Sequence, residues 1–322
     1  MVTPTGPGRT VADLGEFALI DAVRERLGAA ASGPALLLGS GDDAAVVATA
    51  DGRVVATTDV LVEGRHFRTD WSAPADVGAR AAASNLADIA AMGAAPTALL
   101  VGLGIPPETE VEWVLGLVDG VAEEVSGAGA VVAGGDVVRS DRLVVSVTAL
   151  GSLEGRDPVT RSGARAGDLV AVTGRLGWAA AGLAVLSRGF RSPRVLVDAH
   201  RRPAPPYAEG PRAAALGATA MVDVSDGLVA DLGHVARASG VGIELSSDAF
   251  HVPQELTDTA RALNADPVHW LLGGGEDHAL AATFPPDVDL PMAWSVVGRV
   301  ARGDDVLVDG VPWSGPRGWT SF

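Results

Sequence analysis

Aspartate recurs in five short motifs whose side chains could bind divalent cations. Hydroxyl or amide side chains accompany it in three of them, and glycine in the other two. The motifs are Gly41-Asp42-Asp43, Thr57-Thr58-Asp59, Asn85-Leu86-Ala87-Asp88, Gly134-Gly135-Asp136 and Asp223-Val224-Ser225-Asp226. An Asp at the end of a strand commonly caps a helix or begins a turn, and that alternative stays open for any single motif.

Asp88 fits a capping or turn role least well. It lies within a predicted helix over residues 75–92, and nearly all of its neighbours are apolar. A buried carboxylate is costly unless it is paired, and the sequence places no cation within helical reach. Asn85 lies three residues earlier, on the same face. The pair predicts a site for a hard divalent cation, which takes oxygen ligands.

The chemistry that these residues suit is phosphoryl transfer. The motifs offer carboxylate, hydroxyl and amide oxygens but no apparent base or nucleophile. In phosphoryl transfer the protein mainly positions the reactants and neutralises charge, and magnesium ions do much of that work. Glycines beside the Asp residues would let backbone N–H groups approach an anion. The residues alone therefore predict a metal-dependent ATP enzyme and leave its acceptor open.

The charge balance narrows the ways in which phosphate could be bound. The net charge is −16 with a pI of about 4.7, so nucleic acid and anionic membrane are poor partners. All 24 basic residues are arginine. A Walker-type lysine loop and any lysine-based covalent chemistry are therefore excluded. The chain also has no cysteine, which excludes disulfides and thiolate chemistry.

The composition predicts a folded, two-domain protein. Hydrophobic residues make up 48% of the 322 residues and charged residues 20%. No apolar run is long enough to predict a membrane span, and residues 1–12 resemble a disordered tail more than a signal peptide. We expect a cytoplasmic protein with an N-terminal domain over residues 13–150 and a C-terminal domain over residues 151–322.

Helical and strand patterns alternate in both halves, which predicts an α/β or α+β class. The first half is expected to contain helices at residues 16–27, 75–92 and 108–126. Its strands are expected at 45–49, 53–59, 98–103, before and up to Gly134-Gly135-Asp136, and at 142–150. The second half is expected to contain helices at 177–187, 226–239 and 253–263, and strands at 169–173, 219–224, 241–245, 279–284 and 294–300.

Taken in order, the motifs resemble those of the thiamine-monophosphate kinases, a family of the aminoimidazole-ribonucleotide-synthetase-like superfamily. The resemblance runs from about Gly15 to the C-terminus. Besides the Asp motifs it includes Glu63-Gly64-Arg65-His66-Phe67, Thr160-Arg161-Ser162-Gly163-Ala164, Gly274-Gly275-Glu276-Asp277 and Gly318-Trp319. It implies an N-terminal α/β domain whose sheet pairs across a homodimer, and a C-terminal α/β domain that closes over the substrates. The implied reaction transfers a phosphoryl group from ATP to thiamine monophosphate, giving thiamine diphosphate and ADP, within a magnesium cluster.

The resemblance also implies a role for individual residues. The implied magnesium ligands are Asp43, Thr57, Thr58, Asp59, Asp88, Asp136, Asp223 and Asp226. Five of them would also be catalytic, namely Asp43, Asp59, Asp88, Asp136 and Asp223. The implied ATP-binding residues are Gly135, Asp136, Arg161 and Ser225. Thiamine monophosphate would be bound by His66, Glu276 and Trp319.

Two positions depart from the family pattern. Val137 and Val138 follow Gly-Gly-Asp where hydroxyl residues are common, and His278 replaces the usual tyrosine after Gly-Glu-Asp. Val137 and Val138 would leave fewer polar groups around the metals, and His278 would alter the acceptor pocket. Neither removes an implied ligand.

Related enzymes and a non-catalytic role are the alternatives. A selenophosphate synthetase would be expected to carry a reactive cysteine or selenocysteine and a lysine, and a hydrogenase-maturation dehydratase a C-terminal cysteine. This chain has neither lysine nor cysteine. An aminoimidazole ribonucleotide synthetase shares the fold, but its motif contexts fit less well. A non-catalytic binding protein should have lost one or more of the Asp positions, and none is missing.

Overall fold

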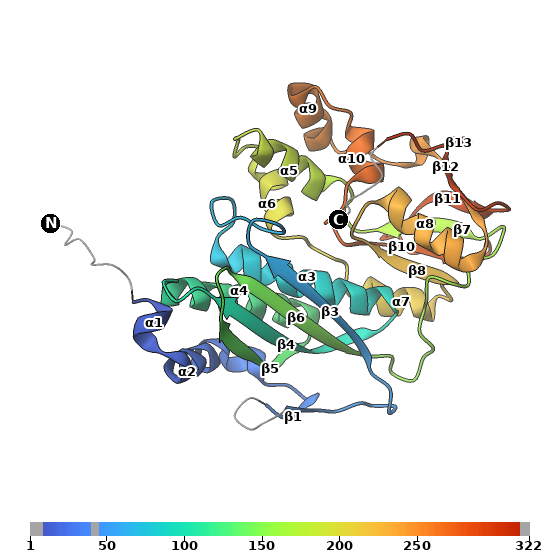
Figure 1. The fold of residues 1–322 in the computed structure, drawn as a ribbon. Coiled ribbons are helices and arrows are strands. Elements are labelled where there is room, and N and C mark those ends of the chain that lie inside the picture. Colours follow the sequence, from blue (N-terminus) through green and yellow to red (C-terminus); the bar gives the residue numbers. More distant parts are fainter. Residues whose placement is uncertain (1–8, 40–44, 316–322) are drawn as a thin grey trace. The chain divides into compact units, whose positions relative to one another are not determined.

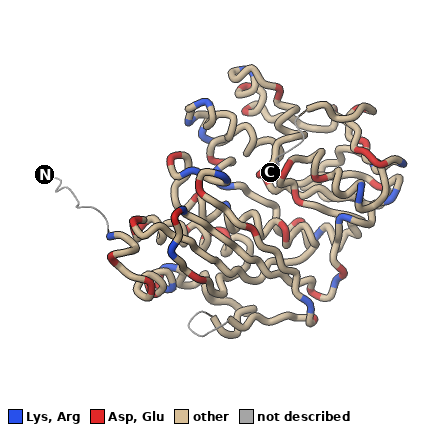
Figure 2. Tube along the Cα trace, in the orientation of Figure 1, with Lys and Arg blue, Asp and Glu red and all other residues tan. Residues whose placement is uncertain are grey.

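The computed structural model describes residues 9–39 and 45–315, which form two compact units (Figure 1). Of these residues, one unit comprises 9–39, 45–85 and 96–152, and the other comprises 86–95 and 153–315. Among the described residues, no helix is long and apolar enough to cross a membrane. Acidic and basic residues occur along both units (Figure 2).

The first unit is built on a four-stranded sheet in the order β3-β6-β4-β5. These strands are β3 (Val55–Val62), β6 (Val144–Ser152), β4 (Ala95–Ile105) and β5 (Val131–Arg139). β3 pairs with β6 antiparallel, and β4 pairs with β5 parallel. β1 (Leu36–Leu38) and β2 (Val46–Val47) form a separate antiparallel pair. The edges of the four-stranded sheet are therefore β3 and β5.

The same unit contains several helices. They are α1 (Val11–Leu14), α2 (Glu16–Leu27) with the 3₁₀ turn Gly28–Ala31, and α4 (Val111–Ala128), and α3 (Pro74–Ala91) begins in the same unit. α3 and α4 cross at glycines. A Cβ at Gly78 would lie 2.0 Å from the Leu117 carbonyl oxygen, and one at Gly120 would lie 1.9 Å from that of Ala75. This backbone contact fixes the helix that carries Asn85 and Asp88.

The second unit contains a seven-stranded sheet in the order β13-β12-β9-β11-β7-β10-β8. The strands are β7 (Leu169–Thr173), β8 (Ala220–Val224), β9 (Gly242–Leu245), β10 (Ala279–Phe284), β11 (Ser295–Ala301), β12 (Val306–Val308) and β13 (Val311–Pro312). The helices are α5 (Trp178–Ser187), α6 (Arg194–Arg201), α7 (Glu209–Ala215), α8 (Leu228–Ser239), α9 (Gln254–Leu263) and α10 (Pro267–Gly273), with a 3₁₀ turn at Ser247–Ala249.

Two apolar clusters cover the two faces of this sheet. Val222 and Val224 pack in one cluster with Leu228 and Leu232 of α8, whereas Met221 packs in the other with Ala213 of α7. Successive strand residues point to opposite faces, so a strand buried on both sides must be apolar throughout. Every residue of β8 and of β10 is indeed buried. Asp223 departs from this apolar pattern, because it is a carboxylate and yet only 4% exposed.

Several predicted element boundaries were wrong. Gly134-Gly135-Asp136 does not end its strand, because β5 continues to Arg139, and Thr57-Thr58-Asp59 lies inside β3, which continues to Val62. Pairing with β4 and β6 extends both strands, and local sequence does not report such pairing. The helices α6, α7 and α10 and the strands β12 and β13 were not predicted.

Candidate functional site

In the first unit, β3 presents Thr57 and Asp59 on one face and Thr58 on the other, because strand side chains alternate. The Thr58 hydroxyl donates to the Val147 carbonyl at 3.0 Å and accepts a hydrogen bond from Thr148 Oγ1 at 3.0 Å. Within one chain, the structure therefore separates the Thr58 hydroxyl from the side chains of Thr57 and Asp59.

Asn85 has a structural role in this unit. Its side chain is fully buried, its Oδ1 accepts a hydrogen bond from the Asp59 N–H at 3.0 Å, and its Nδ2 donates to the Ala81 carbonyl at 2.9 Å. The Oδ1 hydrogen bond thus holds β3 against α3, and the Nδ2 hydrogen bond lies within α3. A role for Asn85 in binding a cation stays a prediction, and Asp88, on the next turn of α3, is only half-buried.

Asp136 lies in β5, at the opposite edge of the sheet from Asp59. Asp136 pairs with Gly102 of β4, and Val60, next to Asp59, pairs with Ser146 of β6. A Cβ at Gly102 would contact the Ser146 side chain, so these residues form one row across the four strands. Strands about 4.8 Å apart place the two edges roughly 14 Å from each other. Asp59 and Asp136 of one chain are too far apart to bind the same ion.

An apolar pocket of about 100 Å³ adjoins Gly135 and Asp136. Its lining is mainly aliphatic and comes from α2, α4, β4 and β5. Ile20 and Val23 contribute from α2, and Val101 contributes from β4. A pocket of this kind suits a flat apolar group whose polar end lies beside the Gly-Asp pair.

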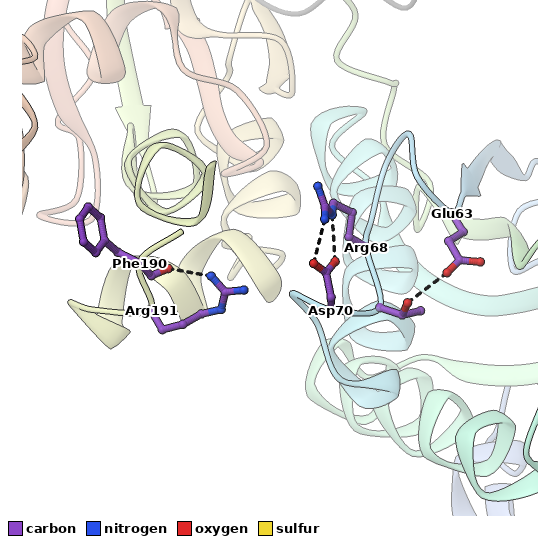
Figure 3. A network of polar contacts seen from close by, with 6 residues as sticks. Glu63, Arg68, Asp70, Phe190 and Arg191 are labelled. Atoms are coloured by element: carbon purple, nitrogen blue, oxygen red, sulfur yellow. Dashed lines mark hydrogen bonds and ion pairs between the residues drawn. The ribbon is translucent and has the colours of Figure 1, made fainter. Parts of the chain in front are cut away.

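His66 follows β3 in a loop. Figure 3 shows hydrogen bonds of the loop residues Glu63, Arg68 and Asp70. Thr69 donates to Glu63 at 3.1 Å, and Arg68 makes two hydrogen bonds with Asp70, at 2.9 and 2.8 Å. The His66 Nδ1 accepts a hydrogen bond from the Val62 N–H at 3.0 Å. A neutral imidazole that accepts at Nδ1 carries its proton on Nε2. His66 can therefore donate a hydrogen bond from Nε2 to an anion.

In the second unit, acidic side chains gather around the end of β8. Burial raises the pKa of Asp226, and the charges of Asp223 and Glu276 raise it further, while His234 and Arg161 lower it. The structure thus brings together four implied site residues in this unit, namely Asp223, Asp226, Arg161 and Glu276. A carboxylate whose pKa is raised by neighbouring carboxylates favours a cation at the same place.

His278 extends this group of charges. Its Nδ1 lies 3.0 Å from Asp223 Oδ2, and both side chains are buried. Burial alone would lower the pKa of His278, but the hydrogen bond and charge of Asp223 and the charges of Glu276 and Asp88 raise it overall. Asp88 thus belongs electrostatically to the same group as Asp223 and Glu276.

The loops that carry these residues pack backbone against backbone. A Cβ at Gly275 would lie 2.1 Å from the Ser225 carbonyl oxygen, and the Glu276 N–H donates to that oxygen at 2.8 Å. Glu276 and His278 both have positive φ, at 69° and 51°. Such strain in non-glycine residues persists only where surrounding structure imposes it, and it is common at functional sites.

Two implied site residues, Asp43 and Trp319, lie outside the described residues. Among the described residues, no three His, Asp or Glu side chains form a group that could hold one metal ion. Two residues with clear roles in the geometry were not predicted from the sequence. They are Asp231, which contacts the Ser225–Gly227 turn from within α8, and His278 in its pairing with Asp223.

Comparison with known proteins identifies the family. Two sequence models match, described as the N-terminal and C-terminal domains of AIR synthase related proteins, over residues 41–153 and 165–284. A thiamine-monophosphate kinase of Mycobacterium tuberculosis is 52% identical over 97% of this chain and 93% of its own length. The chain belongs to the thiamine-monophosphate kinase family.

Other members of the family show the same relationship. The thiamine-monophosphate kinase of Corynebacterium glutamicum is 41% identical, over 98% of this chain and 96% of its own length. Among solved structures, AaThiL complexed with AMPPCP and TMP is 35% identical, with a TM-score of 0.80 over 96% of this chain and 98% of the AaThiL chain. The two-domain α/β fold implied by the sequence is confirmed by these matches.

Proposed function

We propose that this protein transfers the γ-phosphoryl group of ATP to thiamine monophosphate, giving thiamine diphosphate and ADP in thiamine biosynthesis. The observation that carries this proposal is full-length similarity to thiamine-monophosphate kinases, which reaches 52% identity. The similar AaThiL structure, which contains AMPPCP and TMP, supports both substrates.

We propose Mg²⁺ as the metal. The donors available near the end of β8 are carboxylates and a serine hydroxyl, which fit a hard cation that prefers oxygen. Bound Mg²⁺ would neutralise the charge of the phosphates. The proposed ligands are Asp43, Thr57, Thr58, Asp59, Asp88, Asp136, Asp223 and Asp226. Thr58 is included because its motif implies it, although its hydroxyl lies away from Asp59.

For ATP we propose Gly135, Asp136, Arg161 and Ser225. The apolar pocket beside Gly135 and Asp136 offers space for the adenine ring. Arg161 acts electrostatically on Asp226 and would supply positive charge to phosphates in a chain that has no lysine. For the acceptor we propose His66 at the phosphate, donating from Nε2, and Glu276 at the aminopyrimidine. Trp319 is proposed to stack on that ring.

We further propose that the protein is a homodimer. The face of the four-stranded sheet that bears Val60 and Leu100 is open, with exposed fractions of 49% and 38% for these side chains. Exposed apolar surface of this kind marks interfaces. In a closed dimer of two such sheets, β3 of one copy would meet β5 of the other. That arrangement would bring Asp136 of the second copy toward Asp59. Cytoplasmic location and the absence of nucleic-acid and membrane partners stay predictions.

A coupled assay for ADP release tests the reaction. We expect turnover with thiamine monophosphate and none with thiamine, because the attacking oxygen must belong to a phosphate that the protein positions. EDTA should abolish turnover, and Mg²⁺ or Mn²⁺ should restore it. Trp319→Ala should raise KM for thiamine monophosphate roughly 10-fold, which corresponds to the loss of one stacking contact, and leave KM for ATP unchanged. Turnover with thiamine, or none with its monophosphate, would contradict the proposal.

A further inference from the structure

The turn Ser225–Gly227 joins β8 to α8 and carries two of the proposed binding residues, Ser225 and Asp226. Helix α8 begins at Leu228, with Gly227 as its N-cap at φ 134° and ψ 144°, and no N-cap side chain closes the helix. Sequence reasoning left open that Ser225 and Asp226 simply cap this helix. In the structure neither does so.

Asp231 caps the turn instead, from inside the helix. Its Oδ2 accepts hydrogen bonds from the Asp226 N–H at 3.1 Å and the Gly227 N–H at 3.0 Å. Its own N–H donates to the Gly227 carbonyl at 2.9 Å. The two N–H groups just before the helix are therefore hydrogen-bonded without Ser225 or Asp226 turning inward. The side chains of these two residues stay available for a ligand.

This way of capping the helix carries an electrostatic penalty. Asp231 is only 2% exposed, so its carboxylate is buried against the turn that carries Asp226. A buried carboxylate beside other carboxylates destabilises the fold unless a positive charge compensates it. Helix stability alone does not explain a charge at this position. A cation bound at the turn does, because it would offset the repulsion.

We propose that Asp231 is a positioning residue, which holds the backbone of Asp226 and Gly227 so that the Asp226 carboxylate and the Ser225 hydroxyl face the metal and nucleotide. The inference rests on the proposed function for its ligands. Asp231 itself binds neither metal nor substrate. It acts through Asp226, and this distinguishes it from the proposed ligands.

Asp231→Asn tests the inference, because the substitution keeps size and one oxygen acceptor but removes the charge. We expect the Kd for Mg²⁺-AMPPCP, measured by calorimetry, and the Mg²⁺ concentration at half-maximal turnover each to rise about 10-fold. KM for thiamine monophosphate should change less than about threefold. The melting temperature in EDTA should be equal to or above that of the wild type, since a buried charge is removed.

A double-mutant cycle with Asp226→Asn separates positioning from general damage. If Asp231 acts through Asp226, the Asp231→Asn substitution should have little further effect on the Kd for Mg²⁺-AMPPCP in the Asp226→Asn background. Additive effects in the cycle would overturn the proposal. An unchanged Kd in the single variant would overturn it as well.

Asp266→Asn provides the matched control. Asp266 is an exposed N-cap that accepts a hydrogen bond from the Val268 N–H of α10 at 2.9 Å. Asparagine also caps helices, so this substitution should leave both the melting temperature and nucleotide binding nearly unchanged. The calorimetric measurement uses no acceptor. A wild-type protein that binds Mg²⁺-AMPPCP but fails to phosphorylate thiamine monophosphate would therefore contradict the proposed function and still test Asp231.

Discussion

The imidazole of His278 lies 3.0 Å from the Asp223 carboxylate, from Nδ1 to Oδ2, inside the second unit. The contact follows from strand pairing, because β10 begins one residue after His278 and pairs with β8 so that Leu280 lies opposite Asp223. A hydrogen bond to one carboxylate oxygen fixes the direction of the other. His278 thus orients a residue that we propose as a magnesium ligand.

Replacing His278 with phenylalanine should remove this donor and keep most of the volume. We expect kcat to fall by about 10- to 100-fold, because a hydrogen bond to a charged group contributes about 1.5–3 kcal/mol. His278→Tyr, which restores the residue common in the family, should retain a donor and most of the activity. Steady-state kinetics at saturating Mg²⁺ measure both. His251→Phe, at an exposed loop position, serves as control. Equal kcat values for His278→Phe and the wild type would exclude this role.

The buried carboxyl group of Asp277 should make the free energy of unfolding depend on pH. Its side chain is buried, and Oδ1 accepts a hydrogen bond from the Ala179 N–H at 2.9 Å. Burial raises the pKa of Asp277 to about 7, against 3.8 for the ordinary value. Between these values the folded protein holds a proton that the unfolded chain has lost. The free energy of unfolding should therefore fall as pH rises from about 4 to about 7 and stay low above it.

Asp277→Asn should flatten this dependence, because asparagine is neutral throughout and keeps its oxygen acceptor. Urea unfolding in EDTA at pH values from 5 to 8 measures the effect. Asp266→Asn, which alters an exposed helix cap, should follow the wild-type curve. If the Asp277 variant keeps the full wild-type dependence on pH, burial of this carboxylate is not its source.

Asp88→Asn tests the aspartate that the sequence singled out first. The substitution keeps size and removes a charge that acts on His278 in the structure. We expect kcat to fall at least about 100-fold, since neutralisation of phosphate charge by metal supplies much of the rate. Circular dichroism should show an intact fold. Asp76→Asn, at a half-buried position in the first turn of the same helix, is the control. Turnover near that of the wild type would make Asp88 structural.

The sequence predicted the chemistry of the site better than its geometry. Asp88 stood out because a carboxylate inside an alanine-rich helix violates the local pattern, and Asp223 because it ends an apolar strand. Asp231 gave no such signal, because an Asp in the first turns of a helix is ordinary. His278 and Asp223 are 55 residues apart, and only the pairing of β8 with β10 brings them together. The separation of Asp59 from Asp136 was not predicted either, because it depends on the order of the strands in the sheet.

That separation leads to a prediction about the dimer. Asp59 and Asp136 lie at opposite edges of one sheet, so we expect each active site to take Asp59 from one chain and Asp136 from the other. Asp59→Asn and Asp136→Asn should each inactivate the homodimer. A heterodimer of the two variants, purified with two different affinity tags, should regain about half of the wild-type activity, because one of its two sites holds both native residues. Activity of that heterodimer no higher than that of either variant alone would contradict the shared site.

The reciprocal heterodimer makes the test decisive. It pairs a wild-type chain with a chain that carries both substitutions. If sites are shared, each of its sites contains one asparagine, so it should be inactive. If each chain builds its own site, the wild-type chain should keep about half of the activity of the dimer. The two heterodimers contain the same two substitutions in total and differ only in how the substitutions are distributed between the chains. Opposite results therefore report the arrangement of the site and not a difference in stability.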